Sequence, residues 1–314
     1  MLGCDNMRVM FMGTTHFSCV VLQQLLDDGY DVVAVVTQPD RPFGRKKVLK
    51  APPVKELAIE HQITVIQPIK IKESIEDVLA FEPDLVVTCA YGQIVPKAIL
   101  DYPKFLCLNV HASLLPKFRG GAPIHWSIIR GEKETGVTLM RMDVGMDSGD
   151  MLSSRSVSIE DQDMMGDVEA KLMEASKVLI HEDLKSYLEG KLSFIPQDKD
   201  LVTLAYTIQR DDEFVTFKRP VVDVYNHIRG LIPWPVGYGV VEGMNVKFHG
   251  VMMSNSKHSS DPGEVVSVDE NGLTIACIGG TVTITQIQPA GKPVTSAHDF
   301  ANGLGRNWKG KRFE

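Results

Sequence analysis

One short stretch of the chain contains side chains that could transfer a chemical group. Asn109 and His111 stand two residues apart at the end of the apolar run Phe105–Val110, so in a β-strand both project from the same face. Asp147 follows in a glycine-rich loop that can fold back onto them. The amide can polarise a carbonyl, the imidazole can move a proton and the carboxylate can hold the imidazole. We predict a catalytic trio of Asn109, His111 and Asp147, although each type is also an ordinary turn residue.

A stiff loop follows His111. Its sequence is Ser113-Leu-Leu-Pro116-Lys-Phe-Arg119-Gly120-Gly-Ala-Pro-Ile, which contains two prolines and two glycines. Proline restricts the backbone and glycine permits tight turns, so the loop can form a fixed wall for a flat ligand. It can equally be a plain connection between a strand and a helix, and the residues alone leave both interpretations open.

Several motifs resemble the signature of the folate-dependent formyltransferases. The specific ones are Asn109-Val-His-Ala-Ser-Leu-Leu-Pro116, Arg119-Gly120 and Asp143-Val-Gly-Met-Asp-Ser-Gly-Asp150. The resemblance covers nearly the whole chain through Met7–Thr14, Thr37–Arg45, Pro233–Pro235 and Ile287–Lys292. The segment Thr37–Arg45 points to the branch of the family that acts on tRNA. Two segments depart from the family pattern: Gly13–Ser18 lacks a proline, and Leu204–Phe217 is acidic where the family has lysine.

The resemblance implies transfer of a formyl group from 10-formyltetrahydrofolate to the α-amino group of methionine on initiator methionyl-tRNA. Asn109 would donate a hydrogen bond to the developing oxyanion, a contribution worth roughly 100-fold in rate. His111 would move the proton, and Asp147 would fix the tautomer of His111. The substrate amine is itself the nucleophile, which explains the absence of a catalytic Ser or Cys. The reaction needs no metal.

The resemblance also locates the folate. We expect it along Ser113, Leu114, Leu115 and Pro116, with Ala90, Tyr91, Gly92 and the segment Met140–Asp147 as walls of the pterin pocket. A dinucleotide is not expected, because the turn Gly13–Ser18 lacks the Gly-x-Gly-x-x-Gly pattern that lets a pyrophosphate approach a helix N-terminus. The chain also lacks a Gly-x-x-x-x-Gly-Lys-Ser/Thr loop.

A run of cations is the candidate RNA contact. Six basic residues and no acid fall within fifteen positions: Arg41, Arg45, Lys46, Lys47, Lys50 and Lys55. Composition alone makes a solvated charged loop equally plausible. The resemblance favours tRNA, with Arg41, Arg45, Lys46 and Lys47 as the contacts. The segment has few apolar residues to pack on a core, so we predict a loop that is mobile in the free protein.

Other functions remain open at this point. An amino-sugar nucleotide formyltransferase would share the fold, but the basic segment argues against that acceptor. A glycinamide ribonucleotide formyltransferase resembles only the first domain. A catalytically idle RNA-binding module on the same fold is the alternative from another class, and the intact trio opposes it.

Composition sets the outer limits. A chain of 314 residues with 44% hydrophobic residues fits two packed domains, and no apolar run is long enough to cross a bilayer. The net charge of −7 argues against non-specific binding of nucleic acid by the whole surface. Five scattered cysteines without a Cys-x-x-Cys pair indicate neither disulfides nor zinc. We expect a monomer in the bacterial cytoplasm without a signal peptide.

The trio needs a scaffold, and the first 190 residues predict one. The predicted strands are Arg8–Met12, Val32–Thr37, Thr64–Ile66, Leu85–Cys89, Phe105–Val110, Gly136–Met142 and Met151–Ile159. The predicted helices are Phe17–Asp28, Pro53–His61, Glu73–Phe81, Val95–Leu100, Pro123–Arg130 and Met165–Glu189. Apolar strands separated by helices predict an α/β fold with a Rossmann-like wound, mostly parallel sheet, which is the formyltransferase fold. Asn109 and His111 lie at the carboxyl end of a strand, where such sheets bind ligands.

The remaining residues follow another pattern. After a catalytic domain at 1–190 and a linker at 191–207, residues 208–314 predict a helix at Val221–Arg229 and five short strands. These strands are Gly237–Glu242, Val246–Met252, Gly263–Val268, Leu273–Ile278 and Thr281–Ile287. Short strands joined by turns predict a small barrel, and the resemblance implies an OB-like β-barrel. Trp234 and Trp308 are expected as core plugs or lids.

Overall fold

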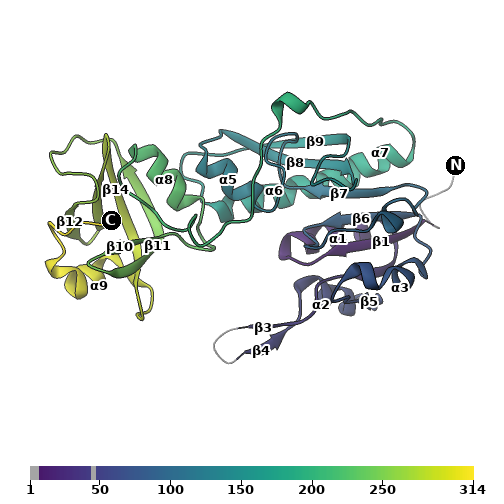
Figure 1. The fold of residues 1–314 in the computed structure, drawn as a ribbon, viewed down its shortest axis with the longest axis horizontal. Helices are drawn as coiled ribbons and strands as arrows, with labels where there is room; N and C mark the ends of the chain where they lie inside the picture. The colour runs from purple at the N-terminus through teal and green to yellow at the C-terminus, as the bar shows by residue number, and fades with distance from the viewer. Residues whose placement is uncertain (1–6, 44–46) are drawn as a thin grey trace. The chain divides into compact units, whose positions relative to one another are not determined.

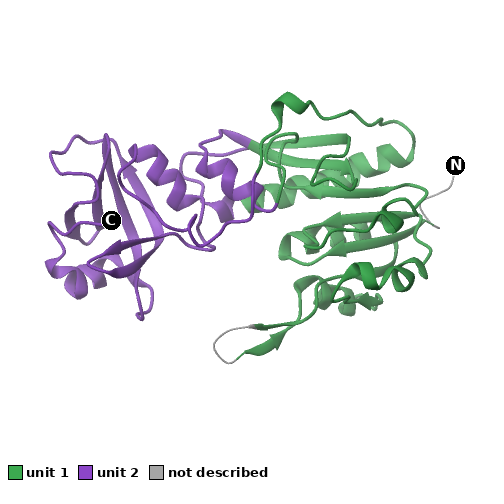
Figure 2. Cartoon of the chain, viewed as in Figure 1, with its two compact units in different colours: residues 1–120, 135–157, 169–204 green, residues 121–134, 158–168, 205–314 purple. Residues whose placement is uncertain are grey.

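The computed structural model describes residues 7–43 and 47–314. By their contacts these residues divide into two compact units (Figure 2). Unit 1 contains the described residues up to 120 together with 135–157 and 169–204, and unit 2 contains 121–134, 158–168 and 205–314. Segments from the middle of the chain therefore pack with the C-terminal part. The expected boundaries at 190 and 208 follow the linear order of the chain and stay a prediction.

Seven strands form one sheet among the described residues of the N-terminal part (Figure 1). The spatial order is β5 (Val65–Ile66), β2 (Asp31–Val36), β1 (Arg8–Gly13), β6 (Leu85–Cys89), β7 (Cys107–His111), β8 (Glu134–Arg141) and β9 (Met151–Ser158). Neighbours from β5 to β7 are parallel, and β8 is antiparallel to β7. The five residues of β6 are all buried, as expected for a strand covered on both faces. The predicted wound, mostly parallel sheet is confirmed.

Helices connect these strands. They are α1 (His16–Asp27), α2 (Pro53–Glu60), α3 (Ile75–Leu79), α4 (Lys97–Leu100), α6 (Met165–Val178) and α7 (Lys185–Leu188), with 3-10 turns at Ile71–Glu73 and Lys199–Leu201. A π-helical stretch at Leu179–Leu184 joins α6 to α7. The single helix expected at Met165–Glu189 is therefore continuous but locally widened.

The turn before α1 shows how the chain manages without the family's proline. Thr15 is the N-cap of α1, and its side chain forms a capping box with Ser18. The Ser18 hydroxyl also donates to the carbonyl of Cys89 at 2.6 Å, which ties the turn to the end of β6. Side-chain hydrogen bonds thus hold a turn that proline stiffens elsewhere in the family.

The basic segment contains regular structure, contrary to the expected loop. β3 (Arg41–Phe43) pairs antiparallel with β4 (Val48–Lys50), and together they form a separate two-stranded ribbon (Figure 1). The sequence did not reveal this hairpin because backbone hydrogen bonds alone can pair two three-residue strands without an apolar pattern. Arg45 and Lys46 lie outside the described residues.

Unit 2 contains an antiparallel sheet and three helices. In this unit, all of whose residues are described, the strand order is β10 (Tyr238–Val241), β11 (Met244–Ser254), β14 (Gly280–Pro289), β13 (Gly272–Cys277) and β12 (Val265–Asp269), and β15 (Thr295–Ser296) pairs with β14. Its helices are α5 (Pro123–Ile129), α8 (Val221–Arg229) and α9 (Ala297–Asn302), with a 3-10 turn at Leu304–Asn307. The end of the chain bridges the two edges of the sheet, because Phe313 pairs with Val241 and Arg312 pairs with Glu264. The predicted C-terminal β-sheet domain is confirmed.

The two tryptophans differ in environment. Trp308 is 3% exposed and packs edge-on against Phe300, so the expectation of a core plug is confirmed there. Trp234 is 62% exposed, and its ring contacts His125 at a centroid distance of 5.9 Å. A core plug at Trp234 was therefore wrong. Trp234 lies in a turn between Pro233 and Pro235, and its ring remains at the surface.

The acidic segment that departs from the family pattern is folded into unit 2. The Asp212 carboxylate accepts a hydrogen bond from the backbone of Gln209 at 2.8 Å, which closes a local turn. The Asp212 carbonyl accepts from His227 Nε2 at 2.7 Å, and Arg219 donates to His227 Nδ1 at 2.6 Å. His227 is therefore held in its neutral form, with one ring nitrogen donating and the other accepting.

We expect the protein to lose stability as the pH falls below 6.5. Burial lowers the pKa of His227 and of His125 from the ordinary value of 6.5. Between the unfolded and folded pKa values the unfolded chain binds protons that the folded chain does not. The free energy of unfolding then decreases by up to about 1.4 kcal/mol per pH unit for each proton. The loss begins near the unfolded pKa and levels off below the folded one.

Scanning calorimetry between pH 7.5 and 5.5 measures this effect as the pH dependence of Tm. His227→Gln cannot titrate but keeps a donor for the Asp212 carbonyl, so its Tm should vary less with pH. His298→Gln serves as the control, because His298 is exposed beside Asp299. Equal slopes for wild type and His227→Gln would contradict the role given to His227.

Candidate active site

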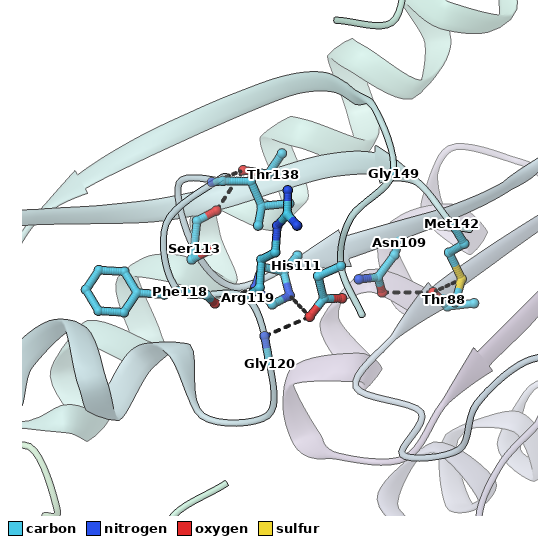
Figure 3. Close-up of polar contacts among 12 residues, drawn as sticks. Thr88, Asn109, His111, Ser113, Phe118, Arg119, Gly120, Thr138, Met142 and Gly149 are labelled. Atoms are coloured by element: carbon cyan, nitrogen blue, oxygen red, sulfur yellow. Dashed lines mark hydrogen bonds and ion pairs between the residues drawn. The ribbon is translucent and has the colours of Figure 1, made fainter. Parts of the chain in front are cut away.

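Asn109 lies on β7, directly beside Thr88 on β6 in the parallel register. The Thr88 hydroxyl donates to Asn109 Oδ1 at 2.8 Å (Figure 3). A carbonyl oxygen can only accept, so this contact engages one end of the amide and leaves the N–H end for another partner. The strand pairing places that amide at the carboxyl edge of the sheet.

His111 follows on the same strand, and two contacts define its ring. Nε2 lies 3.0 Å from the carbonyl oxygen of Phe118, which can only accept, so Nε2 carries a hydrogen. Nδ1 lies 3.6 Å from Asp147 Oδ2. Nδ1 is therefore the ring nitrogen that is able to accept a proton, and a protonated ring would face the negative charge of the carboxylate. The Phe118 carbonyl fixes the tautomer, a task that the sequence assigned to Asp147.

Asp147 reaches this position through a strained loop. Its φ is +48°, which is uncommon for a residue with a side chain, and Phe118 likewise has a φ of +59°. Such conformations persist where surrounding contacts enforce them. Here the backbone N–H of Gly120 donates to Asp147 Oδ2 at 2.9 Å. The loop from 143 to 149 is further closed by Asp143, which accepts from Gly145 N at 2.8 Å and from the Ser148 hydroxyl at 2.7 Å.

Gln197, which the sequence did not single out, ties this loop to the loop after His111. Its Nε2 donates to the carbonyls of Asp147 at 2.8 Å and Gly149 at 2.7 Å. Its Oε1 accepts from Arg119 Nε at 3.0 Å and Nη2 at 2.8 Å. The side chain is buried with both ends of the amide engaged. Local sequence carried no signal for it, because its partners lie 48 to 78 positions away.

Hydrogen bonds within the loop and with Thr138 stabilise the loop that is expected to line the folate. The Ser113 hydroxyl donates to the Lys117 carbonyl at 2.7 Å, and the Thr138 hydroxyl donates to the Ser113 carbonyl at 2.7 Å. Leu115 N donates to the same threonine at 3.2 Å. Ser113 and Leu115 are buried, whereas Leu114 and Pro116 are partly exposed. The side chains of Ser113 and Leu115 therefore shape the loop, and its exposed parts are left to contact a ligand.

The second predicted wall, Ala90 to Gly92, follows β6. Ala90 is exposed and Tyr91 is buried. The Tyr91 carbonyl accepts from the Thr14 hydroxyl at 2.9 Å and from Gln38 Nε2 at 3.1 Å. Gln38 in turn accepts from Arg41 at 3.2 Å, so the base of the basic hairpin is connected to this wall.

The cysteines near the trio are not nucleophiles. Burial raises the pKa of Cys89 and of Cys107 to about 12. Both thiols therefore stay protonated at neutral pH, and only a thiolate attacks effectively. Neither thiol is therefore a candidate nucleophile for a transfer reaction at this site.

Only two of the four predicted RNA contacts lie among the described residues. Arg41 and Lys47 are exposed, and Arg45 and Lys46 lie outside the described residues. Lys55 forms an ion pair with Asp40 at 2.8 Å, which removes one cation from the basic run. Gln67 also donates to Asp40. The hydrogen bond from Gln67 has the largest effect, and together with the one from Lys55 it holds the pKa of Asp40 below its ordinary value.

Two family models match the chain. One, described as formyl transferase, matches residues 7–184 and so covers more than half of the chain. The other, the formyl transferase C-terminal domain, matches residues 207–305. The chain belongs to the formyl transferase family. Gln197 lies in the segment between the two matches.

Close relatives of this formyltransferase are bacterial. It is 47% identical over 301 residues to the methionyl-tRNA formyltransferase of Bacillus licheniformis, with 95% of each chain covered. It is 48% identical over 299 residues to the methionyl-tRNA formyltransferase of Bacillus subtilis, with 94% of each chain covered. High identity over both domains shows that the similarity is not limited to the catalytic motif.

Solved structures share the fold of this formyltransferase. The methionyl-tRNA formyltransferase from Clostridium thermocellum superposes with a TM-score of 0.56 at 18% identity, covering 80% of this chain and 95% of that one. WlaRD, a sugar 3N-formyl transferase solved with dTDP and 5-N-formyl-THF, gives a TM-score of 0.67 at 18% identity, covering 91% and 99%. At these identities the likeness establishes the fold alone.

Two further findings concern the described part of this formyltransferase. No helix there is long and apolar enough to cross a membrane. Within the same residues, no three side chains of His, Cys, Asp or Glu gather in a way that could hold a metal ion.

Proposed function

We propose that this formyltransferase transfers the formyl group of 10-formyltetrahydrofolate to the α-amino group of methionine on initiator methionyl-tRNA. The relatives that match over about 95% of the chain are methionyl-tRNA formyltransferases, which supports this acceptor over an amino-sugar nucleotide. The observation that carries the chemistry is the arrangement of Asn109, His111 and Asp147 at the end of β7. The three side chains come from two segments and meet where a wound sheet binds its ligand.

The proposed reaction uses the trio without a covalent intermediate on the enzyme. The substrate amine attacks the formyl carbon, and a tetrahedral intermediate forms whose oxygen carries negative charge. The Asn109 N–H, free because Thr88 occupies the other end of the amide, donates to that oxygen. His111 Nδ1 takes a proton from the amine and returns one to folate N10 as the bond from N10 to the formyl carbon breaks. Asp147 stabilises the imidazolium between these two transfers.

The folate is proposed to lie between the loop from Ser113 to Pro116 and the wall from Ala90 to Gly92. Two observations support this position. Val144 and Met146 flank the Asp147 loop with exposed fractions of 73% and 52%, so a flat apolar ring could cover them. The structure of WlaRD, which shares the fold, is described in the presence of 5-N-formyl-THF. The pterin would then contact the segment from Met140 to Asp147.

The tRNA is proposed to contact the basic hairpin. Arg41, Arg45, Lys46 and Lys47 are the proposed residues, and the cations would bind phosphates. Initiator methionyl-tRNA belongs to translation, so we place the enzyme in the bacterial cytoplasm, where it would work as a monomer and without a metal.

A formyl-transfer assay tests the function directly. Purified protein, 10-formyltetrahydrofolate and methionylated initiator tRNA should yield formyl-methionyl-tRNA, whereas uncharged tRNA should remain unchanged. A dTDP-amino-sugar acceptor in the same assay tests the rival function. Transfer to the amino sugar but not to the aminoacylated tRNA would contradict the proposal.

We expect the cations of the basic segment from Arg41 to Lys55 to set the salt dependence of tRNA binding. Changing Arg45, Lys46 and Lys47 together to alanine should weaken binding at low salt and reduce the slope of log K against log [salt] by about 2 to 3, because fewer counterions are released. Arg41→Ala should instead lower kcat/KM with folate binding unchanged. Filter binding of initiator tRNA at several salt concentrations measures the slope, and Lys97→Ala, a surface cation paired with Asp101, is the control. An unchanged slope would make the hairpin a solvated connection.

A further inference from the structure

Thr88 occupies an unusual position for a buried polar side chain in this sheet. It is 2% exposed on β6, and its hydroxyl oxygen lies near three acceptors. Figure 3 shows the contacts to Asn109 and Met142. These are Asn109 Oδ1 at 2.8 Å, Met142 Sδ at 3.1 Å and the Leu108 carbonyl at 3.3 Å. The hydroxyl has a single hydrogen, and the Asn109 oxygen is the nearest acceptor and a stronger one than sulfur. Thr88 therefore donates to Asn109.

The orientation of the Asn109 amide matters because its two ends have the same shape but opposite hydrogen-bonding character. With Oδ1 on Thr88, the N–H group faces away and can meet a developing oxyanion. In the reversed orientation, Oδ1 would face that oxyanion and repel it. The Thr88 hydrogen would then have only the longer contacts to Met142 or Leu108. In that orientation Asn109 Nδ2 could still donate to the Thr88 oxygen, so it is the Thr88 hydrogen, which Oδ1 accepts at the shortest distance, that favours the orientation the reaction needs.

We propose that Thr88 is a positioning residue that holds the Asn109 amide with its N–H group toward the formyl oxygen. This inference rests on the proposed role of Asn109 in the transfer reaction. Thr88 does not touch the reacting atoms itself, so its contribution acts entirely through Asn109. The sequence did not indicate Thr88, because a threonine in an apolar strand is ordinarily interpreted as a β-branched core residue.

Two substitutions at this position separate the hydroxyl from the packing. Thr88→Val keeps the shape but leaves the partly buried Asn109 Oδ1 without its donor, which disfavours the competent orientation. We expect kcat to fall about tenfold, with KM for both substrates within about twofold of wild type. Thr88→Ser keeps the hydroxyl and should return kcat to within about threefold of wild type.

A matched control comes from the same sheet. Thr135 on β8 is also buried at 2% exposure, and its hydroxyl has no hydrogen-bond partner among the residues described. Thr135→Val removes an equivalent hydroxyl and should keep wild-type kcat. A Tm for each variant confirms that the comparison is made on folded protein.

The decisive measurement is a double-mutant cycle with Asn109→Ala, followed under single-turnover conditions so that slow variants remain measurable. Asn109→Ala alone should lower the rate by about 100-fold or more. Adding Thr88→Val to Asn109→Ala should cause no further loss, since there is no amide left to orient. A full tenfold loss in that background would assign Thr88 a structural role and overturn the inference.

The remaining outcomes separate the inference from the proposed function. If Asn109→Ala is impaired while Thr88→Val keeps wild-type kcat, the orienting role is refuted and the role of Asn109 stands. If Thr88→Ser is as slow as Thr88→Val, the methyl group rather than the hydroxyl matters, and the inference is again refuted. If Asn109→Ala itself keeps wild-type kcat, the proposed mechanism fails together with everything that depends on it.

Discussion

Replacing His111 by alanine is expected to lower kcat by about 10²- to 10⁴-fold while the protein stays folded and binds folate normally. The reason is geometric. Nδ1 is the ring atom available for proton transfer, because Nε2 is committed to the Phe118 carbonyl. Alanine removes the proton carrier and leaves the loops of the site held by other contacts, including those of Gln197. Steady-state assays with methionylated initiator tRNA, and folate binding followed by fluorescence, measure the two quantities separately.

A second histidine in the same unit provides the control. His181 is exposed, and its Nδ1 lies 2.7 Å from Asp28 Oδ1. It does not belong to the trio, so His181→Ala should keep wild-type turnover. If His111→Ala also turned over at the wild-type rate, proton transfer would have to be assigned to another group or to solvent.

The second large effect is expected for Asp147→Asn, with a fall in kcat of about 10²-fold or more. Asparagine keeps an oxygen that can accept from Gly120 N, so the loop should retain its position. The substitution therefore removes mainly the negative charge that faces His111 Nδ1 at 3.6 Å. Without that charge the imidazolium formed during transfer loses its stabilising partner, and KM for either substrate should change little.

Asp147→Ala extends the test. It removes the charge and also the acceptor for Gly120, so it should be slower than Asp147→Asn and should lower Tm slightly. Asp101→Asn, a surface carboxylate paired with Lys97, is the control for a loss of charge. Near-normal kcat in Asp147→Asn would show that the carboxylate serves to hold the loop and not to stabilise charge.

The sequence alone predicted most of the scaffold. Leu85–Cys89 and Val221–Arg229 have the predicted bounds, and most other strand and helix ends differ by a few residues. Apolar runs and helical periodicity are local properties, so they can be read from neighbouring positions. The trio was predictable for a related reason. Strand alternation puts Asn109 and His111 on one face of the strand. The resemblance of the segment around Asp147 to a family motif indicated Asp147 as the third member.

Predictions from the local sequence pattern were wrong where that pattern did not specify the contacts that decide the structure. The basic segment forms a hairpin, although its three-residue strands carry no alternating apolar pattern. Trp234 is exposed, although tryptophan next to proline suggested a plug. In both cases the side-chain pattern was compatible with several structures, and the environment of the folded unit chose one.

The sequence by itself determined the wound sheet and the C-terminal sheet domain, and it predicted the three residues of the proposed trio. Only the tertiary structure decided how the trio is held: Thr88 engages the Asn109 amide, the Phe118 carbonyl sets the His111 tautomer, and Gln197 joins the two loops of the site. These partners are hydroxyl, carbonyl and amide groups, which every segment of a protein offers in abundance. The two residues joined by such a contact can be as many as 78 positions apart in the chain. Their roles are therefore defined by the distance and direction between the groups after folding, and no pattern of neighbouring residues specifies them.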